Sequence, residues 1–189
     1  MTSVVIVVFD GLQPSQVNPD LMPNLSRMAA GGVTFTNHHP VYPSVTRANV
    51  ASMVTGLNPG GHGLAGNRLM VRDFNPNRSI SALEPELTQV AEKTGRVLLA
   101  PTLAEILSRH GHEYMAIGAG TSGNAYLQNP TAEKFGGATI HPEFTLPRSL
   151  NQKLTDRFGA WPDESRPNTQ RTCLLYTSDA ADDTPCVDL

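Results

Sequence analysis

The chain has little of what marks nucleic-acid-binding, membrane or fibrous proteins. Its 14 Lys and Arg are outnumbered by 17 Asp and Glu, which gives a formal net charge of −3, and no basic stripe indicates binding to a phosphate backbone. No apolar run approaches the roughly 20 residues of a membrane-spanning helix. Aromatic residues make up 6% of the chain, whereas 16 Gly and 15 Pro are typical of a loop-rich globular domain. We therefore expect neither a nucleic acid nor a membrane as a partner.

Cysteine is nearly absent. Both copies, Cys173 and Cys186, lie in the segment 173–189, and this segment resembles the in-frame translation of a sequencing adapter. We therefore predict two parts, an authentic domain over residues 1–172 and an artefact tail over residues 173–189. The natural protein is then expected to continue past Thr172. This division removes both cysteines from any disulfide or metal site.

The amino terminus has none of the marks of a secretory signal. The first three residues carry no basic side chain, the apolar run that follows ends at Asp10–Gly11, and no small-residue cleavage site is present. The lack of cysteine in the authentic part is compatible with a reducing compartment. We therefore expect a cytoplasmic protein. The sequence does not indicate an oligomeric state.

Alternating strand and helix patterns predict an α/β fold with a mostly parallel sheet. Residues 3–9 are a continuous apolar run of mainly β-branched residues, which is typical of a strand buried on both faces. We expect further strands at 33–36 and 114–117, and helices at 23–30, 46–55, around 87–91 and at 102–109. The segment 124–167 is rich in Pro and Gly and predicts few regular elements. This order of elements places helices on the faces of the sheet.

Three polar residues stand where these elements begin or end. Asp10 follows the strand predicted at 3–9, at the carboxyl end where open α/β sheets bind ligands. Thr46 opens the helix predicted at 46–55, and Asn49 lies one turn further on the same face. The positive end of a helix favours both an alkoxide and a bound phosphate. Asn49 could then donate to a phosphoryl oxygen, and Asp10 could hold a divalent metal that lowers the pKa of the hydroxyl.

Each of these residues also has an ordinary structural explanation. A Thr at the start of a helix is most often a cap. An Asp that follows a strand is commonly a turn residue or a cap. The local pattern alone therefore leaves both explanations open.

The order of several short motifs is more specific than any one of them. The motifs are Val4–Gly11, Met22–Leu25, Gly32–Phe35, Tyr42–Asn49, Val54–Pro59 and His62–Gly63. Over residues 3–67 this series resembles the type I phosphodiesterase/nucleotide pyrophosphatase branch of the alkaline phosphatase superfamily. The resemblance implies an alkaline-phosphatase-like sheet sandwiched by helices, present here in truncated form.

The resemblance also implies a mechanism and a substrate class. Asp10 and Thr46 would bind one of two divalent metal ions, usually Zn²⁺. Thr46 would attack phosphorus and form a covalent phosphothreonine, while Asn49 would hold the phosphoryl oxygens. A metal-activated water would then complete the hydrolysis. The implied substrate is a small-molecule phosphodiester or pyrophosphate.

Two departures from the family pattern change these expectations. Arg47 and Ala48 stand where an aromatic residue and Pro usually follow the nucleophile, so nucleotides are not assured as substrates. Arg47 becomes a candidate for contacting phosphate, and its alternative is an ordinary surface residue of the helix. The downstream Asp and His ligands, among them an Asp-His-Gly, are missing. We expect little or no activity from the chain as it stands, because it lacks a complete pair of metal sites.

The histidines of the chain do not replace those ligands. They are His38, His39, His62, His110, His112 and His141. A zinc site needs three or four convergent donors, whereas pairs on loops and at helix ends are more often surface residues. His62 lies in a Gly-rich turn and is a candidate for a structural or substrate-loop role.

Three other functions remain compatible with the same residues. A phosphonoacetate hydrolase or a phosphomonoesterase of the superfamily would use the same Thr46. A non-catalytic anion-binding domain would keep the fold without the chemistry. A sulfatase is disfavoured, because sulfatases have Cys or Ser in a different signature at the nucleophile position.

Overall fold

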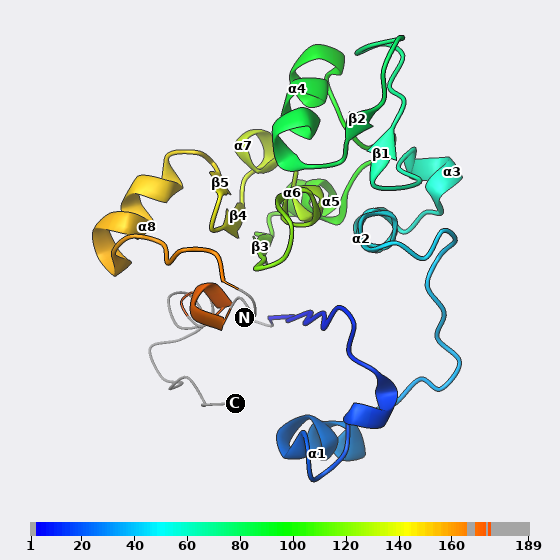
Figure 1. The fold of residues 1–189 in the computed structure, drawn as a ribbon, viewed down its shortest axis with the longest axis vertical. Coiled ribbons are helices and arrows are strands. Elements are labelled where there is room, and N and C mark those ends of the chain that lie inside the picture. Colours follow the sequence, from blue (N-terminus) through cyan, green and yellow to red (C-terminus); the bar gives the residue numbers. More distant parts are fainter. Residues whose placement is uncertain (1–2, 166–168, 173, 175–189) are drawn as a thin grey trace. The chain divides into compact units, whose positions relative to one another are not determined.

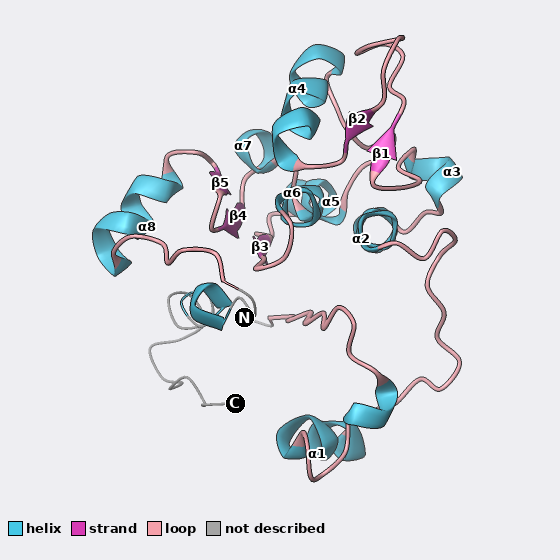
Figure 2. Ribbon diagram, viewed as in Figure 1, coloured by secondary structure: helices cyan, strands magenta, loops and turns pink. Residues whose placement is uncertain are grey.

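The computed structural model describes residues 3–165, 169–172 and 174. It divides into two compact units, residues 1–40 and residues 41–189, which are described separately below. Figure 1 traces the chain from its amino terminus, and Figure 2 distinguishes its helices, strands and loops. Apart from Leu174, the predicted artefact tail lies outside the described residues.

The first unit contains one regular α-helix. The 3-10 turn η1 (Pro14–Gln16) precedes helix α1 (Pro23–Gly31), which confirms the helix predicted at 23–30. Pro23 occupies the first helical position, where its missing N–H would have had no intrahelical partner. At the other end the N–H of Gly32 donates to the carbonyl of Ala29.

The strands predicted at 3–9 and 33–36 do not form. Residues 3–9 are irregular, and the side chains of Val4 to Phe9 are 53–84% exposed. The sheets of the described chain contain no strand from the first unit, and a strand persists only when a neighbour completes its hydrogen-bond ladder. The apolar pattern of residues 3–9 is therefore strand-like, but the described residues supply no partner for it.

The second unit begins with the helix that carries the candidate nucleophile. Helix α2 (Thr46–Thr55) has the predicted bounds. It ends at Gly56, whose left-handed conformation (φ 71°) lets its N–H donate to the carbonyl of Ser52. Its buried residues are Ala48, Val50, Ala51 and Val54, whereas Met53 is half exposed.

The rest of the second unit alternates short helices with short strands. The elements bounded within residues 59–158 are α3 (Pro59–His62), β1 (Arg68–Leu69), β2 (Ile80–Ser81), α4 (Glu84–Thr94), α5 (Leu103–Arg109), β3 (Met115–Ile117), α6 (Ser122–Gln128), α7 (Ala132–Phe135), β4 (Ala138–His141), β5 (Phe144–Leu146) and α8 (Leu150–Phe158). The predictions of α4, α5 and β3 are confirmed. The expectation of few regular elements over 124–167 was wrong, because Gly136 and Gly159 end helices there instead of preventing them.

The sheets are small and mixed rather than mostly parallel. Strand β3 pairs with β4 in parallel, so that Ile117 lies opposite Ile140, and β4 pairs with β5 in antiparallel fashion. Strands β1 and β2 form a separate antiparallel pair. The α/β class is confirmed, whereas a large sheet sandwiched between helices stays a prediction.

The core of the second unit lies where α2, α4 and α6 meet β4 and β5. Its fully buried members include Ala51, Leu64, Leu87 and Leu127. Gly123 of α6 faces the segment between β2 and α4, where a Cβ atom would collide with the backbone carbonyl of Ala82. This glycine lets α6 approach that backbone more closely than any other residue would allow. None of the helices in the described ranges is both long and apolar enough to cross a bilayer.

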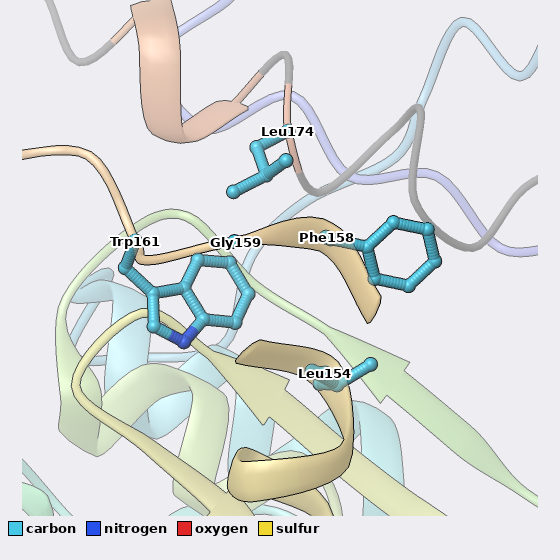
Figure 3. Close-up of a pocket in the computed structure, with 5 residues that line it drawn as sticks. All are labelled: Leu154, Phe158, Gly159, Trp161 and Leu174. Atoms are coloured by element: carbon cyan, nitrogen blue, oxygen red, sulfur yellow. The ribbon is translucent and has the colours of Figure 1, made fainter. Parts of the chain in front are cut away.

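A small apolar pocket lies at the end of α8 (Figure 3). Its lining residues are Leu154, Phe158, Gly159, Trp161 and Leu174. The indole N–H of Trp161 donates to Oδ1 of Asn151 at 3.1 Å, which fixes the ring on α8. The pocket volume of about 10 Å³ is close to the room that one water molecule needs. This pocket is therefore too small for an organic substrate.

An ion pair with one buried partner ties α4 to the segment before α8. The carboxylate of Glu84, a residue that is only 6% exposed, accepts hydrogen bonds from Arg148 Nη2 and from the hydroxyl of Thr88. The Arg148 guanidinium also lies over the ring of Phe144, 5.6 Å from its centroid. Removing the cation would leave a buried carboxylate with less compensation.

We expect Arg148→Met to lower the free energy of unfolding by about 1–2 kcal/mol, less than for a fully buried pair because the Arg148 side chain is half exposed. Met keeps most of the apolar stem and removes the charge. The control is Arg78→Met, which breaks the more exposed pair with Glu86 and should cost less than about 1 kcal/mol. Urea unfolding of both variants checks the difference, and equal costs would contradict it.

The exposed segment 3–9 leads to a second prediction. Unpaired apolar segments of high β-propensity associate with one another, so the chain should show concentration-dependent association in light scattering. Val7→Lys should reduce this association by placing a charge within the segment, whereas Val7→Ile should not. A chain that stays monomeric at all concentrations would show that the segment is not adhesive.

Candidate active site

Thr46 is half-buried and occupies the first helical position of α2. The N-cap position belongs to Val45, an extended residue (φ −103°, ψ 145°) whose apolar side chain cannot cap. Capping side chains act from the N-cap position, so Thr46 stands one residue too late for this role. As the first residue of α2, Thr46 stands at the end of the helix whose backbone N–H groups have no intrahelical partners.

The side-chain amide of Asn49 is bound to the backbone on both sides. Its Oδ1 accepts the N–H of Val41 at 3.0 Å, and its Nδ2 donates to the carbonyl oxygen of Val45 at 3.0 Å. Asn49 therefore contacts both ends of the segment 41–45 that leads into Thr46. One N–H of the amide remains for a phosphoryl oxygen, and this predicted role stays a prediction.

Arg47 is half-buried, and both of its predicted roles, phosphate contact and ordinary residue of the helix surface, stay predictions. Its Nη2 donates to the hydroxyl of Thr121 at 3.3 Å, and its Nε is buried without an acceptor. Burial lowers the pKa of Arg47 from its ordinary value, and neither ion pair of the described chain includes it. A cation held in this way has the charge and the donor for an anionic ligand.

Asp10 belongs to the first unit, whereas Thr46 belongs to the second. It forms a turn with Gly11 (φ 83°), and the N–H of Leu12 donates to the carbonyl of Phe9 at 3.3 Å. This is the turn position that was the alternative explanation of Asp10. A metal ion shared by Asp10 and Thr46 stays a prediction.

The donors that the structure describes do not gather into a metal site. No group of three or more His, Cys, Asp or Glu side chains within residues 3–165, 169–172 and 174 could hold a metal ion. A protein zinc site needs three or four such donors. The described residues by themselves do not supply such a donor set, and the metal pair that the family resemblance implied stays a prediction. His110 and His112 are exposed on either side of Gly111.

His62 is fully buried and joins α3 to α2. Its Nδ1 accepts the backbone N–H of Leu64 at 3.2 Å, and its Nε2 lies 2.9 Å from the hydroxyl oxygen of Ser52. Because Nδ1 accepts a backbone proton, the ring carries its own proton on Nε2 and donates it to Ser52. His62 cannot then act as a base toward Ser52, and its role in the described chain is structural.

His141 repeats this arrangement at the end of β4. Its Nδ1 accepts the N–H of Glu143 at 3.1 Å, and its Nε2 lies 2.8 Å from the carbonyl oxygen of Gly120. Gly120 precedes Thr121, the N-cap of α6. His141 therefore supports the loop that carries the partner of Arg47.

Comparison with known proteins identifies the family. A family model described as type I phosphodiesterase / nucleotide pyrophosphatase matches residues 4–184. The chain belongs to this family. The match includes the whole candidate site and extends into the segment 173–189, where the artefact tail stays a prediction. No solved structure matches the chain.

Curated relatives match a shorter part of the chain. Ectonucleotide pyrophosphatase/phosphodiesterase family member 3 of Bos taurus is 32% identical over 85 residues, 44% of this chain and 10% of the relative. Family member 1 of Homo sapiens is 36% identical over 64 residues (34% and 7%). A venom phosphodiesterase of Macrovipera lebetinus is 37% identical over 71 residues (38% and 8%). The chain thus spans a tenth or less of the length of these relatives.

The sequence patterns did not identify Thr121, His62 or His141 as partners of the site helices. A signal for Thr121 was present, because a Thr that follows the Gly-rich segment 118–120 after a strand is a typical helix N-cap. The two histidines carried no such signal. Their hydrogen bonds depend on burial, which the presence of a single His in the sequence does not reveal.

The buried histidines predict how stability depends on pH. Burial lowers the pKa of both His62 and His141 in the folded state, so below about pH 6.5 the unfolded chain binds protons that the folded chain does not. Stability is therefore fully present above that pH and is lost as the pH falls. The melting temperature should decrease as the pH is lowered from about 7.5 to about 5.5, and it should decrease less steeply in His62→Gln than in the unaltered chain.

The matched control is His110→Gln, which removes an exposed histidine. It should leave the slope of melting temperature against pH unchanged. If His62→Gln and His110→Gln gave the same slope as the unaltered chain, His62 would not be the buried neutral group described above.

Proposed function

We propose that this chain is the N-terminal part of a phosphoester hydrolase that cleaves small-molecule phosphodiesters or pyrophosphates with Thr46 as nucleophile. Family membership supports the reaction class. The observation that carries the assignment of Thr46 is its place at the first position of α2, one residue after the N-cap. A hydroxyl there lies in the positive field of the helix end, which stabilises an alkoxide and an approaching phosphate.

In the proposed reaction, the Oγ1 of Thr46 forms a bond to phosphorus while the bond from phosphorus to the leaving oxygen breaks. The hydroxyl proton passes to solvent, the leaving oxygen takes up a proton from solvent and departs with the rest of the substrate, and a covalent phosphothreonine remains. A water molecule then attacks phosphorus, releases the phosphorylated product and restores the hydroxyl. Splitting the hydrolysis in this way replaces one difficult step by two easier ones.

Arg47 is proposed to contact the substrate. Its guanidinium is anchored by Thr121 and has a buried Nε without an acceptor, which suits it to an oxygen of the substrate phosphate. The aromatic residue that would stack on a nucleoside is absent at this position.

Two divalent metal ions, with Zn²⁺ as the expected metal, remain part of the proposal. Asp10 and Thr46 are the proposed ligands of one ion, and the other ligands would come from residues outside this chain. A cytoplasmic location and the inactivity of the isolated chain likewise stay predictions.

Thr46→Ala tests the proposal in the full-length gene product loaded with zinc. Turnover of bis(4-nitrophenyl) phosphate should fall by on the order of 10³-fold or more, because the attacking oxygen is gone. Bound zinc should be spared, because Asp10 keeps its carboxylate. Thr46→Ser should retain part of the activity.

The matched control is Thr55→Ala at the other end of the same helix. The Thr55 hydroxyl donates to the carbonyl of Ala51. This variant therefore removes a partly buried hydroxyl from α2 and leaves the first turn of the helix unchanged. Near-normal turnover in Thr46→Ala would exclude Thr46 as the nucleophile. Substrate profiling against phosphonoacetate and phosphomonoesters then separates the branches that use the same residue.

A further inference from the structure

The segment 41–45 reaches Thr46 through a turn that Asn49 holds at both ends. The amide oxygen of Asn49 accepts the N–H of Val41, and the amide nitrogen donates to the carbonyl of Val45. The backbone N–H of Asn49 donates to the same carbonyl at 3.1 Å, and Val45 N–H donates to Pro43 at 2.8 Å. Three of these four hydrogen bonds are made by Asn49.

The Val45 carbonyl is the point where this turn and α2 meet. It accepts two hydrogen bonds from Asn49, one from the main chain and one from the side chain. Val45 directly precedes Thr46, so the orientation of its peptide plane sets the direction in which the Cα–Cβ bond of Thr46 points. Both side-chain bonds are partly buried, where competition from water is reduced.

We propose that Asn49 is a positioning residue, which fixes the Thr46 hydroxyl for attack by tying Val41 and Val45 to the first turn of α2. This inference rests on the proposed function of Thr46. It assigns the Asn49 amide to the backbone rather than to the phosphoryl oxygens. Shifts of about 1 Å in a reacting group can cost on the order of 10²-fold in rate, so a brace at this point controls reactivity without touching substrate.

The two roles respond differently to a carboxylate at residue 49. Asn49→Asp keeps an oxygen that accepts the Val41 N–H and loses the donor to Val45. If Asn49 is a positioning residue, Asp should therefore hold the segment 41–45 better than Ala, which keeps neither bond. As a phosphoryl contact, Asp is worse than Ala, because its negative charge repels an anionic substrate.

The first test uses NMR on the chain of 189 residues and needs no turnover. In Asn49→Ala, the Val41 amide should lose protection from hydrogen exchange by roughly tenfold, and the methyl signal of Thr46 should shift or broaden. Asn49→Asp should restore the Val41 protection at least in part. The control is Met53→Ala on the exposed side of α2, which should leave both signals unchanged.

Unchanged Val41 protection and an unchanged Thr46 methyl signal in Asn49→Ala would overturn the proposal. If Asn49→Ala does not fold, the Val41 protection and the Thr46 methyl signal of Asn49→Asp are compared with those of the unaltered chain to test the proposal. Retained Val41 protection with a shifted Thr46 methyl signal supports the brace, and loss of the protection in Asn49→Asp overturns it.

The second test measures kcat and KM for bis(4-nitrophenyl) phosphate in the full-length gene product. Asn49→Ala should lower kcat roughly ten- to a hundredfold and leave KM within about twofold. Asn49→Asp should recover part of kcat with KM unchanged. A raised KM and a kcat below that of Ala would assign the amide to the phosphoryl group and overturn the inference. Failure of the proposed function is distinguishable, because Thr46→Ala would then retain its turnover.

Discussion

The packing of helix α2 against helix α6 is the contact on which the candidate site depends. Ala48 and Ala51 of α2 are fully buried, and α2 and α6 form an extensive contact within the described part of the second unit. The same contact brings Arg47 to Thr121, the residue that opens α6. The start of α2 is thereby fixed from two sides, by α6 and by the turn that precedes it.

The environment of this helix start is polar but not freely solvated. Thr46, Arg47 and Asn49 are all half-buried, and burial lowers the pKa of the guanidinium. Charge interactions are stronger in such a place than in water, because the effective dielectric constant is lower. An anionic group would therefore interact more strongly with a cation here than with the same cation on an open surface.

The helices were predictable from the sequence because their signals are local. Helix α5 begins with a capping box of Thr102 and Glu105, and α2 ends at a glycine in the left-handed conformation. The absence of a strand at 3–9 was not predictable in this way. A strand depends on a neighbouring strand, and its own residues do not show whether that neighbour is present. The prediction of few regular elements over 124–167 was wrong for a related reason. Glycines end helices as readily as they occur in loops.

The candidate site was predictable to a similar extent. The place of Thr46 at a helix start followed from the local pattern and the family motifs. The contact between Arg47 and Thr121 spans 74 positions of the chain, and no local pattern contains it. The double engagement of the Asn49 amide depends on how the segment 41–45 folds back on α2, which residue types alone do not specify.

Gly123 of α6 affects the candidate site although it does not belong to it. A single methyl group at this position would meet the Ala82 carbonyl and push α6 away from the backbone before α4. Since the N-cap of α6, Thr121, anchors Arg47, the displacement would be transmitted along the helix to the guanidinium. The absence of a side chain at Gly123 therefore helps to determine where the Arg47 guanidinium lies.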